Sequence, residues 1–320
     1  MLVLKGKDLE KAISPAELIE AVEEAMVMYE GKNFNMPPRM HAEHEGNVLL
    51  LMPAFTSSAF GTKLVSVFPG NQEKGIPVIQ GTMILNDGNS GSPMALMDAA
   101  VLTGLRTGAV GAVGVKHLAG RNARNLGIIG AGVQAWHLAV LSNEARSFDK
   151  TYIADLDRNK SEVLAEKLRG TYGLQVSVLE SGREILEASD VIITATTSLQ
   201  PVIPGDSKLL KGKTFVGIGS FTPEMREYPD ELYPMLEHVY VDSRQALEES
   251  GDLSVAIESG LLKNSQVSTF GRFLNDPYEI PVGSTNFFKS VGMALFDLVV
   301  ARKIYESAKA RQLGITIDFP

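Results

Sequence analysis

The stretch Leu126-Gly127-Ile128-Ile129-Gly130-Ala131-Gly132-Val133-Gln134-Ala135 decides how the middle of this 320-residue chain folds. An apolar run that ends at Gly130 leads into the pattern G-x-G-x-x-A and then into a helix predicted over Val133–Ala145, so a strand, a tight turn and a helix follow one another. Gly130 permits the turn, Gly132 lets a ligand approach the backbone, and Ala135 allows the helix to pack closely on the strand. Free N–H groups at the start of such a helix bind a diphosphate well. We therefore predict a dinucleotide site, against the alternative of a glycine-rich turn that binds nothing.

A carboxylate follows at the distance along the chain that a dinucleotide requires. The segment Tyr152-Ile153-Ala154-Asp155 predicts a second strand, and Asp155 at its end lies about 20 residues beyond the glycines. A carboxylate there accepts both ribose hydroxyls of NAD and repels the 2′-phosphate of NADP. Arg158 nearby could partly accommodate that phosphate, and Asp155 could also be an ordinary solvated loop residue. We predict NAD(H) as the cofactor, with NADP less favoured.

From Asn125 onward, strand-like and helix-like segments alternate. This alternation predicts a parallel sheet with right-handed crossovers, which is the architecture of a Rossmann-type α/β domain. After the first strand, further strands are predicted over Thr151–Asp155, Gln175–Val178, Val191–Ala195, Thr214–Gly219 and Val239–Asp242, and helices over Ser161–Tyr172 and Gly182–Ala188.

The residues before this region predict a domain of another kind. Ser14-Pro15-Ala16-Glu17 has the pattern of a helix start, and apolar residues recur at helical spacing from there to about Gly31. Strand-like segments follow, separated at Pro53, at Pro69-Gly70-Asn71 and at Asp87-Gly88-Asn89, which predicts an antiparallel sheet. These strands are predicted over Val48–Met52, Gly61–Phe68 and Val78–Asn86, and a helix of small residues over Ala99–Leu118.

The last part of the chain is predicted to return to this first domain. A single helix is predicted over Phe287–Gln312, because apolar residues from Val291 to Ile304 keep a helical period. We therefore predict a Rossmann NAD-binding domain over 119–292. It is inserted into a discontinuous α+β domain, formed by 1–118 and 293–320, that binds the substrate.

Composition excludes several classes of function. The chain has 30 Lys and Arg against 38 Asp and Glu, a formal net charge of −8, which argues against nucleic-acid binding. It has no cysteine, so disulfides, thiolate catalysis and Cys-ligated metal sites are excluded. His41 and His44 lie in a predicted extended segment without a third ligand, and we expect them on the surface with no metal bound. No apolar stretch suits a signal peptide or a membrane span, so the cytoplasm is the expected location.

Three cations stand out in the N-terminal part: Arg39 beside a Pro-Pro turn, Lys63 in a predicted strand, and Arg106 in the helix of small residues. Arg106 is the most informative, because a guanidinium among small and apolar neighbours is costly to desolvate without an anionic partner. Taken singly, each of the three is more readily explained as a structural ion-pair residue or a solvated side chain. Their spacing along the chain does not bring them together.

A series of short motifs occurs along essentially the whole chain. They are Met36-Pro37-Pro38-Arg39, Leu51-Met52-Pro53, Gly61-Thr62-Lys63, Phe68-Pro69-Gly70-Asn71, Leu105-Arg106-Thr107, Gly130-Ala131-Gly132-Val133-Gln134-Ala135 and Lys289-Ser290-Val291-Gly292-Met293-Ala294. In order and spacing this series resembles the ornithine cyclodeaminase/mu-crystallin family. The resemblance implies a homodimer in which the N-terminal sheets of two subunits associate. It also implies that Arg39, Lys63 and Arg106 converge on the α-carboxylate of an amino acid or imino acid, close to the nicotinamide.

Members of this family catalyse several different reactions, and the residues at a few positions distinguish the branches of the family. Cyclodeaminases are expected to carry one carboxylate after a Val-Gly-Gly strand end and another just before Leu-Met-Pro, and these positions hold Phe221 and Leu50 here. The segment Pro223-Glu224-Met225-Arg226-Glu227 instead looks like the ketimine-reductase/mu-crystallin branch, although Asp155 departs from the basic NADP-type turn of mu-crystallin. Asp297 resembles a residue that several relatives keep near the active site, but an ordinary polar residue of a helix is the favoured interpretation.

We therefore predict an NADH-dependent reduction of a C=N bond next to a carboxylate. The substrate would be a cyclic ketimine such as 1-pyrroline-2-carboxylate or 1-piperideine-2-carboxylate, or the reaction would be that of a related amino-acid dehydrogenase such as alanine dehydrogenase. The alternatives are an ornithine cyclodeaminase with bound NAD and a non-catalytic mu-crystallin-like binding protein. The predicted catalytic residues are Lys63 and Arg106, and the predicted substrate-binding residues are Arg39, Lys63, Arg106 and Thr107. The predicted cofactor-binding residues are Gly130, Ala131, Gly132, Val133, Gln134, Asp155, Arg158, Thr196 and Ser290.

Overall fold

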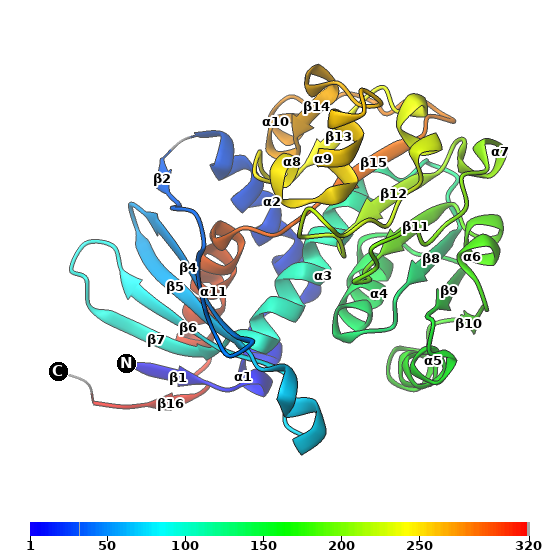
Figure 1. Cartoon of the computed structure of the whole chain (residues 1–320). Coiled ribbons are helices and arrows are strands. Elements are labelled where there is room, and N and C mark those ends of the chain that lie inside the picture. Colours follow the sequence, from blue (N-terminus) through cyan, green and yellow to red (C-terminus); the bar gives the residue numbers. More distant parts are fainter. Residues whose placement is uncertain (32, 319–320) are drawn as a thin grey trace. The chain divides into compact units, whose positions relative to one another are not determined.

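The computed structural model describes residues 1–31 and 33–318, and its internal contacts divide the chain into two compact units. The first unit consists of Met1–Arg106 and Met293–Pro320, and the second of Thr107–Gly292. The boundary expected after residue 118 therefore falls inside a helix, α3 (Ala99–Leu118), rather than at its end (Figure 1). The physical reason is that the second half of α3 packs on its own neighbours in the second unit, as the contact of Gly111 with Leu138 illustrates.

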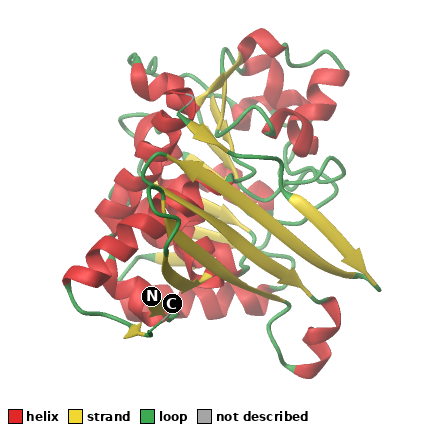
Figure 2. Ribbon diagram, turned by 90° about the vertical axis from the view of Figure 1, so that its left-hand side faces the viewer, coloured by secondary structure: helices red, strands yellow, loops and turns green. Residues whose placement is uncertain are grey.

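The first unit contains a largely antiparallel sheet, whose long strands are the broad arrows of Figure 2. Its order is β16-β1-β7-β6-β5-β4-β2, with β3 also paired to β4. The strands are β1 (Leu2–Leu4), β2 (Phe34–Asn35), β3 (Met40–His44), β4 (Asn47–Thr56), β5 (Ala59–Val67), β6 (Ile79–Asp87), β7 (Pro93–Asp98) and β16 (Ile315–Thr316), and a 3-10 helix covers Pro69–Lys74. The predicted antiparallel sheet is confirmed, and the pairing of β1 with β16 brings both ends of the chain to it.

The expected break at Pro53 is wrong. Strand β4 runs through this proline, which lies opposite Thr62 of β5. On the other side of β4, β3 pairs up to Leu51 and β2 begins at Phe55, so Pro53 lies in the gap between these two partners. A proline is tolerated there because no neighbouring strand in the gap requires its missing N–H.

Three helices accompany this sheet: α1 (Gly6–Ala12), α2 (Pro15–Gly31) and α11 (Ala294–Ala310). The predicted start of α2 is confirmed. The backbone N–H of Glu17 donates to Oγ of Ser14, and the backbone N–H of Ser14 donates to the Glu17 carboxylate, which together form a capping box. Helix α11 packs against α2 and against β4, β5 and β6, so the end of the chain completes the core of the first unit.

The single helix predicted over Phe287–Gln312 is wrong at its beginning. Residues Asn286–Lys289 form a buried strand, β15, and α11 begins only at Ala294. The strand has parallel partners on both sides, so all four of its residues are buried, without the alternation that marks a half-exposed strand. Gly292 separates the two elements with a φ of 78°, a conformation that favours glycine.

The second unit contains a parallel sheet of order β10-β9-β8-β11-β12-β15-β13-β14. Its strands are β8 (Asn125–Ile129), β9 (Lys150–Ala154), β10 (Val176–Val178), β11 (Val191–Thr194), β12 (Thr214–Gly217), β13 (Val239–Val241), β14 (Val267–Thr269) and β15. Strand β8 lies between β9 and β11, so the order reverses there, and ligands bind at such a switch point beside the carboxyl ends of the strands. The Rossmann-type α/β fold is thereby confirmed.

Short and long helices connect these strands (Figure 1). Beside α3 they are α4 (Val133–Ala145), α5 (Arg158–Tyr172), α6 (Gly182–Ala188), α7 (Ser207–Leu210), α8 (Ala246–Glu249), α9 (Gly251–Glu258) and α10 (Phe270–Asn275), with 3-10 helices over Asp230–Met235 and Asn264–Gln266. Helices α7 to α10 and strand β14 were not predicted from the sequence. Among the described residues, none of the helices has both the length and the apolar character to cross a membrane.

Candidate active site

Three charged side chains of the first unit form a buried cluster. Lys63 comes from β5, Arg106 from α3 and Asp297 from α11. Oδ2 of Asp297 lies 2.8 Å from Nζ of Lys63, and Oδ1 accepts a hydrogen bond of 3.1 Å from Nε of Arg106. The exposed fractions of Lys63, Arg106 and Asp297 are 2%, 8% and 0%. Charges so far from water require partners, and Asp297 is the partner of both cations.

The local structure explains why these side chains point inward. In β5 the buried residues alternate, so Lys63 shares the inner face with Ala59 and Gly61. Asp297 lies in the first turn of α11, where all residues from Ala294 to Ala301 are buried. The interpretation of Asp297 as an ordinary polar residue of a helix is therefore wrong. A lone charge within an apolar run was the available signal, and it is the same signal that singled out Arg106.

The positive charge of this cluster exceeds its negative charge. Within the part of the chain that the structure describes, Asp297 is the one carboxylate in an ion pair with Lys63 or Arg106. Burial lowers the pKa of Lys63 to about 8, the Asp297 carboxylate acts in the opposite direction, and the guanidinium groups of Arg106 and Arg39 lower it further. The structure thus brings together two of the three cations that the sequence singled out, Lys63 and Arg106, while Arg39 acts on Lys63 through its charge. Their role in binding substrate stays a prediction.

The glycine turn after β8 has the geometry of a diphosphate site. Gly130 has a φ of 99°, and a Cβ atom there would lie 2.7 Å from the carbonyl oxygen of Ala195, so only glycine fits. Gly132 is the N-cap of α4 without a side-chain cap, and a Cβ there would meet nothing within 4 Å. The backbone at this helix start is therefore open to a ligand. The neighbouring Val133 is 78% exposed, and the side-chain oxygen of Gln134 is buried without a hydrogen-bond partner in the described structure.

The Asp155 carboxylate is held beside this turn. It accepts hydrogen bonds from the backbone N–H of Ala131, at 2.7 Å, and of Asp157, at 2.8 Å. Each oxygen keeps a second lone pair for a ribose hydroxyl. The Ala131 N–H is already used, so it does not face a phosphate in this arrangement. Arg158 donates to Glu180 at 2.7 Å and to Glu162 at 3.3 Å, which leaves it committed to two carboxylates rather than to a 2′-phosphate.

The remaining predicted cofactor residues of the second unit are also bonded within the protein. Thr196 donates its backbone N–H and its hydroxyl to Glu227, at 2.7 and 2.8 Å. Ser290 donates its hydroxyl to the buried carboxylate of Asp242, at 2.6 Å. These roles of Glu227 and Asp242 were not predicted from the sequence. Thr107, predicted to bind substrate, has a buried side chain, and its role stays a prediction.

The geometry around the glycine turn is suited to binding NAD(H). The open space at Gly132, the uncapped start of α4 and the unpartnered oxygen of Gln134 are features that a bound dinucleotide would complete. No such arrangement surrounds His41 or His44, which lie exposed on β3. Among the described residues there is no group of three or more His, Asp or Glu side chains placed to hold a metal ion.

The chain is similar to known proteins of the family that its motifs resemble. Residues 1–312 match the model of the ornithine cyclodeaminase/mu-crystallin family. The Delta(1)-pyrroline-2-carboxylate reductase of a Bacillus cereus strain is 33% identical over 332 residues, which cover 100% of this chain and 100% of the relative. The resemblance and its reductase branch are thereby confirmed.

Two solved structures share the whole fold. The Delta(1)-pyrroline-2-carboxylate reductase of Thermococcus litoralis, in complex with NADH and L-proline, has a TM-score of 0.91 and 32% identity and covers 99% of this chain and 100% of its own. An archaeal alanine dehydrogenase dimer with bound NAD has a TM-score of 0.90 and 29% identity and covers 100% of this chain and 99% of its own.

Substitution of Asp297 by Asn tests the charged cluster. Asp297→Asn is expected to lower the free energy of unfolding by about 3 kcal/mol, because Lys63 and Arg106 would stay buried without their shared counter-charge. Denaturation in urea, followed by circular dichroism, measures this change.

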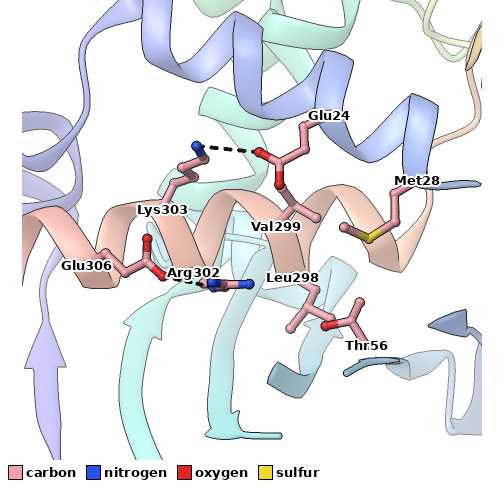
Figure 3. Close-up of a pocket in the computed structure, with 8 residues that line it drawn as sticks. All are labelled: Glu24, Met28, Thr56, Leu298, Val299, Arg302, Lys303 and Glu306. Carbon is pink, nitrogen blue, oxygen red and sulfur yellow. Dashed lines mark hydrogen bonds and ion pairs between the residues drawn. The ribbon is translucent and has the colours of Figure 1, made fainter. Parts of the chain in front are cut away.

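Glu24→Gln is the matched control. Glu24 of α2 pairs with Lys303 of α11 at 3.4 Å, each side chain is 48% exposed, and Figure 3 shows the pair at a small pocket of about 90 Å³. An exposed pair of this kind contributes about 0–1 kcal/mol. Losses of equal size in the two variants would contradict the assignment of Asp297 as the buried counter-charge.

Proposed function

The chain belongs to the ornithine cyclodeaminase/mu-crystallin family, and from this premise we propose that it is an oxidoreductase that reduces a C=N bond next to a carboxylate with NADH. The substrate is a cyclic ketimine such as 1-pyrroline-2-carboxylate or 1-piperideine-2-carboxylate. Run in reverse on a primary amino acid, the same chemistry passes a hydride to NAD and gives an imine, whose hydrolysis releases a 2-oxo acid and ammonia, as in an amino-acid dehydrogenase such as alanine dehydrogenase. One observation carries the proposal: Lys63 and Arg106 are both buried and share the single carboxylate of Asp297. A substrate carboxylate would balance the remaining positive charge.

The first unit supplies the groups that bind the substrate. Arg106 is fixed by Asp297 through Nε, and its terminal N–H groups would bind the substrate carboxylate, because a guanidinium binds carboxylates through two parallel hydrogen bonds. Arg39 adds a second guanidinium whose field reaches Lys63. Lys63, with a pKa of about 8, holds a proton at neutral pH and can release it to a developing amine. A protonated imine is the better acceptor of electrons, so a proton near the imine nitrogen favours reduction.

The second unit supplies the cofactor site. Gly130, Gly132 and the start of α4 would hold the diphosphate, and Asp155 would hold the ribose of the adenosine. NADH, when bound, supplies the hydride that reduces the imine carbon. The relatives with NADH or NAD bound support the choice of cofactor. The ion pairs of Arg158 support NAD over NADP.

We infer that two copies of the chain associate through the sheet of the first unit. Large apolar side chains are exposed on one face of it, among them Met40 (61%) on β3 and Leu49 (37%) and Phe55 (45%) on β4. Exposed apolar residues on neighbouring strands are typical of a surface that another protein covers. The similar archaeal alanine dehydrogenase is a dimer, which supports the association of two copies.

Activity assays test the reaction. The protein is expected to oxidise NADH with a cyclic ketimine carboxylate and to release no ammonia from L-ornithine plus NAD, because Phe221 and Leu50 offer no charge to the side-chain ammonium. Arg106→Ala is expected to lower kcat/KM for the ketimine by about 10- to 100-fold, which corresponds to about 1.5–3 kcal/mol for a charged hydrogen bond. The Kd of NADH should stay the same. Proline and ammonia formed from ornithine at ordinary enzyme rates would make the cyclodeaminase the better interpretation.

Titration with both nicotinamide cofactors tests the role of Asp155. NADH is expected to bind at least about tenfold more tightly than NADPH, because the carboxylate accepts the ribose hydroxyls and repels an added phosphate. Nicotinamide fluorescence measures both constants. Arg158→Ala is the control and should leave the preference unchanged, since Arg158 is paired with Glu162 and Glu180. A preference for NADPH in the native protein would show that Arg158, not Asp155, governs the turn.

The pH dependence of the reduction tests Lys63. Below its pKa of about 8 the side chain is an ammonium, and above it the amine is neutral, so both its charge and its proton are lost as the pH rises. The kcat/KM for ketimine reduction should therefore fall above this pH, by about tenfold per unit at the limit. Titration of the substrate imine could give a similar profile. Lys63→Arg separates the two, because only a limb that belongs to Lys63 would move to higher pH in this variant.

A further inference from the structure

One buried carboxylate of the second unit ties together two loops at the carboxyl ends of neighbouring strands. The loop after β11 donates the backbone N–H and the hydroxyl of Thr196 to Oε1 of Glu227, at 2.7 and 2.8 Å. The loop after β12 donates the backbone N–H groups of Gly219 and Ser220 to Oε2, at 2.9 and 3.1 Å. Glu227 is fully buried, so these four bonds replace the water that the carboxylate has lost.

Glu227 is itself held by two other buried charges. Oδ1 of Asp252 accepts the backbone N–H groups of Glu227 and Tyr228, at 2.7 and 3.1 Å. Nζ of Lys289, at the end of β15, lies 3.4 Å from Oδ2 of Asp252 and 3.9 Å from Oε2 of Glu227. Burial raises the pKa of Glu227, and the Lys289 ammonium acts in the opposite direction. The lysine therefore compensates the charge of a carboxylate that the fold keeps away from solvent.

The loops around Glu227 are packed so closely that two positions, one within them and one beside them, accept only glycine. A Cβ atom on Gly219 would collide with Oε1 of Glu227 and with the backbone of Thr196. A Cβ atom on Gly130 would lie 2.7 Å from the carbonyl oxygen of Ala195 and 3.1 Å from Cγ2 of Thr196. The loop that Glu227 holds therefore also abuts the glycine turn of the diphosphate site.

We propose that Glu227 is a positioning residue for the nicotinamide half of the cofactor. It acts through the loops after β11 and β12, which it joins and fixes beside the glycine turn. The inference rests on the proposed function in one respect, namely that the second unit binds NAD(H).

The strand order supports this division of the site. A Rossmann sheet consists of two mononucleotide-binding halves that meet at the switch point. Gly132 and Asp155 follow β8 and β9, on one side of that point, and would hold the diphosphate and the adenosine. Thr196, Gly219 and Ser220 follow β11 and β12, on the other side, where the nicotinamide half belongs. Of these two groups, Glu227 accepts hydrogen bonds from the second, so its loss should affect the two halves of the cofactor unequally.

Binding of NADH and of ADP-ribose to Glu227→Gln tests the proposal. The amide has one oxygen instead of two acceptors, so the N–H groups of one loop lose their partner while the shape is kept. By calorimetry, the Kd of NADH is expected to rise by about tenfold or more. The Kd of ADP-ribose, which lacks the nicotinamide, should change by less than about twofold. Equal weakening of both ligands, or of neither, would overturn the proposal.

One matched control variant makes the result specific. Asp190 also accepts two backbone N–H groups, those of Arg124 and Asn125, at 2.8 and 2.9 Å, but at the amino ends of the strands. Asp190→Asn should therefore leave both constants unchanged, and a selective loss of NADH binding in this variant would contradict the proposal. If the wild-type protein binds neither ligand, the proposed function fails instead, whatever the role of Glu227.

Thr196 gives a milder test that does not depend on the folding of the Glu227 variant. Thr196→Val removes the hydroxyl donor and should weaken NADH but not ADP-ribose, whereas Thr196→Ser keeps the donor and should resemble the wild type. In the double variant the effects of Thr196→Val and Glu227→Gln should be less than additive, because both break one interaction. Full additivity would mean that Thr196 contacts the cofactor independently, and the proposal would fail.

Discussion

The Asp297 carboxylate is fully buried between Lys63 and Arg106, and it joins three segments that are far apart in the sequence. A cation can be kept away from water only beside a negative charge, so β5, α3 and α11 of the first unit must meet where these side chains meet. The return of the last helix to the N-terminal sheet is therefore more than a matter of apolar packing. Without α11, the two cations would have no buried counter-charge.

In the second unit, too, buried carboxylates hold together segments that are distant in the sequence, but their partners are of another kind. Glu227 and Asp252 are fully buried, and most of their hydrogen bonds come from backbone N–H groups of loops rather than from side chains. Loops that lack regular backbone pairing gain a fixed shape from such an acceptor. In the first unit a carboxylate holds the two cations of the proposed substrate site, and in the second a carboxylate holds backbone around the proposed cofactor site.

The sequence predicted the elements that have a clear period or a known turn, and it failed where tertiary contacts decide. The glycine turn, α4 and α6 are local patterns and were placed correctly. Strand β15 was interpreted as helix, since a strand buried on both faces has no alternation. Pro53 was expected to end a strand, because the gap between β2 and β3 is a property of the sheet alone. Asp297 and Glu227 gain their meaning from partners distant in sequence, and no spacing along the chain reveals those partners.

The geometry also explains why one framework can serve different reactions. The cations of the first unit are proposed to bind a carboxylate and the second unit to bind a dinucleotide, and neither feature specifies the rest of the substrate. A further charge on the substrate would need its own buried partner, since an unpaired ammonium costs several kcal/mol in a site removed from water. Phe221 and Leu50 supply no such partner, whereas an imine needs only a proton and a hydride. The choice among reactions of this family therefore depends on which positions carry a second charge, more than on the carboxylate and dinucleotide sites that the reactions share.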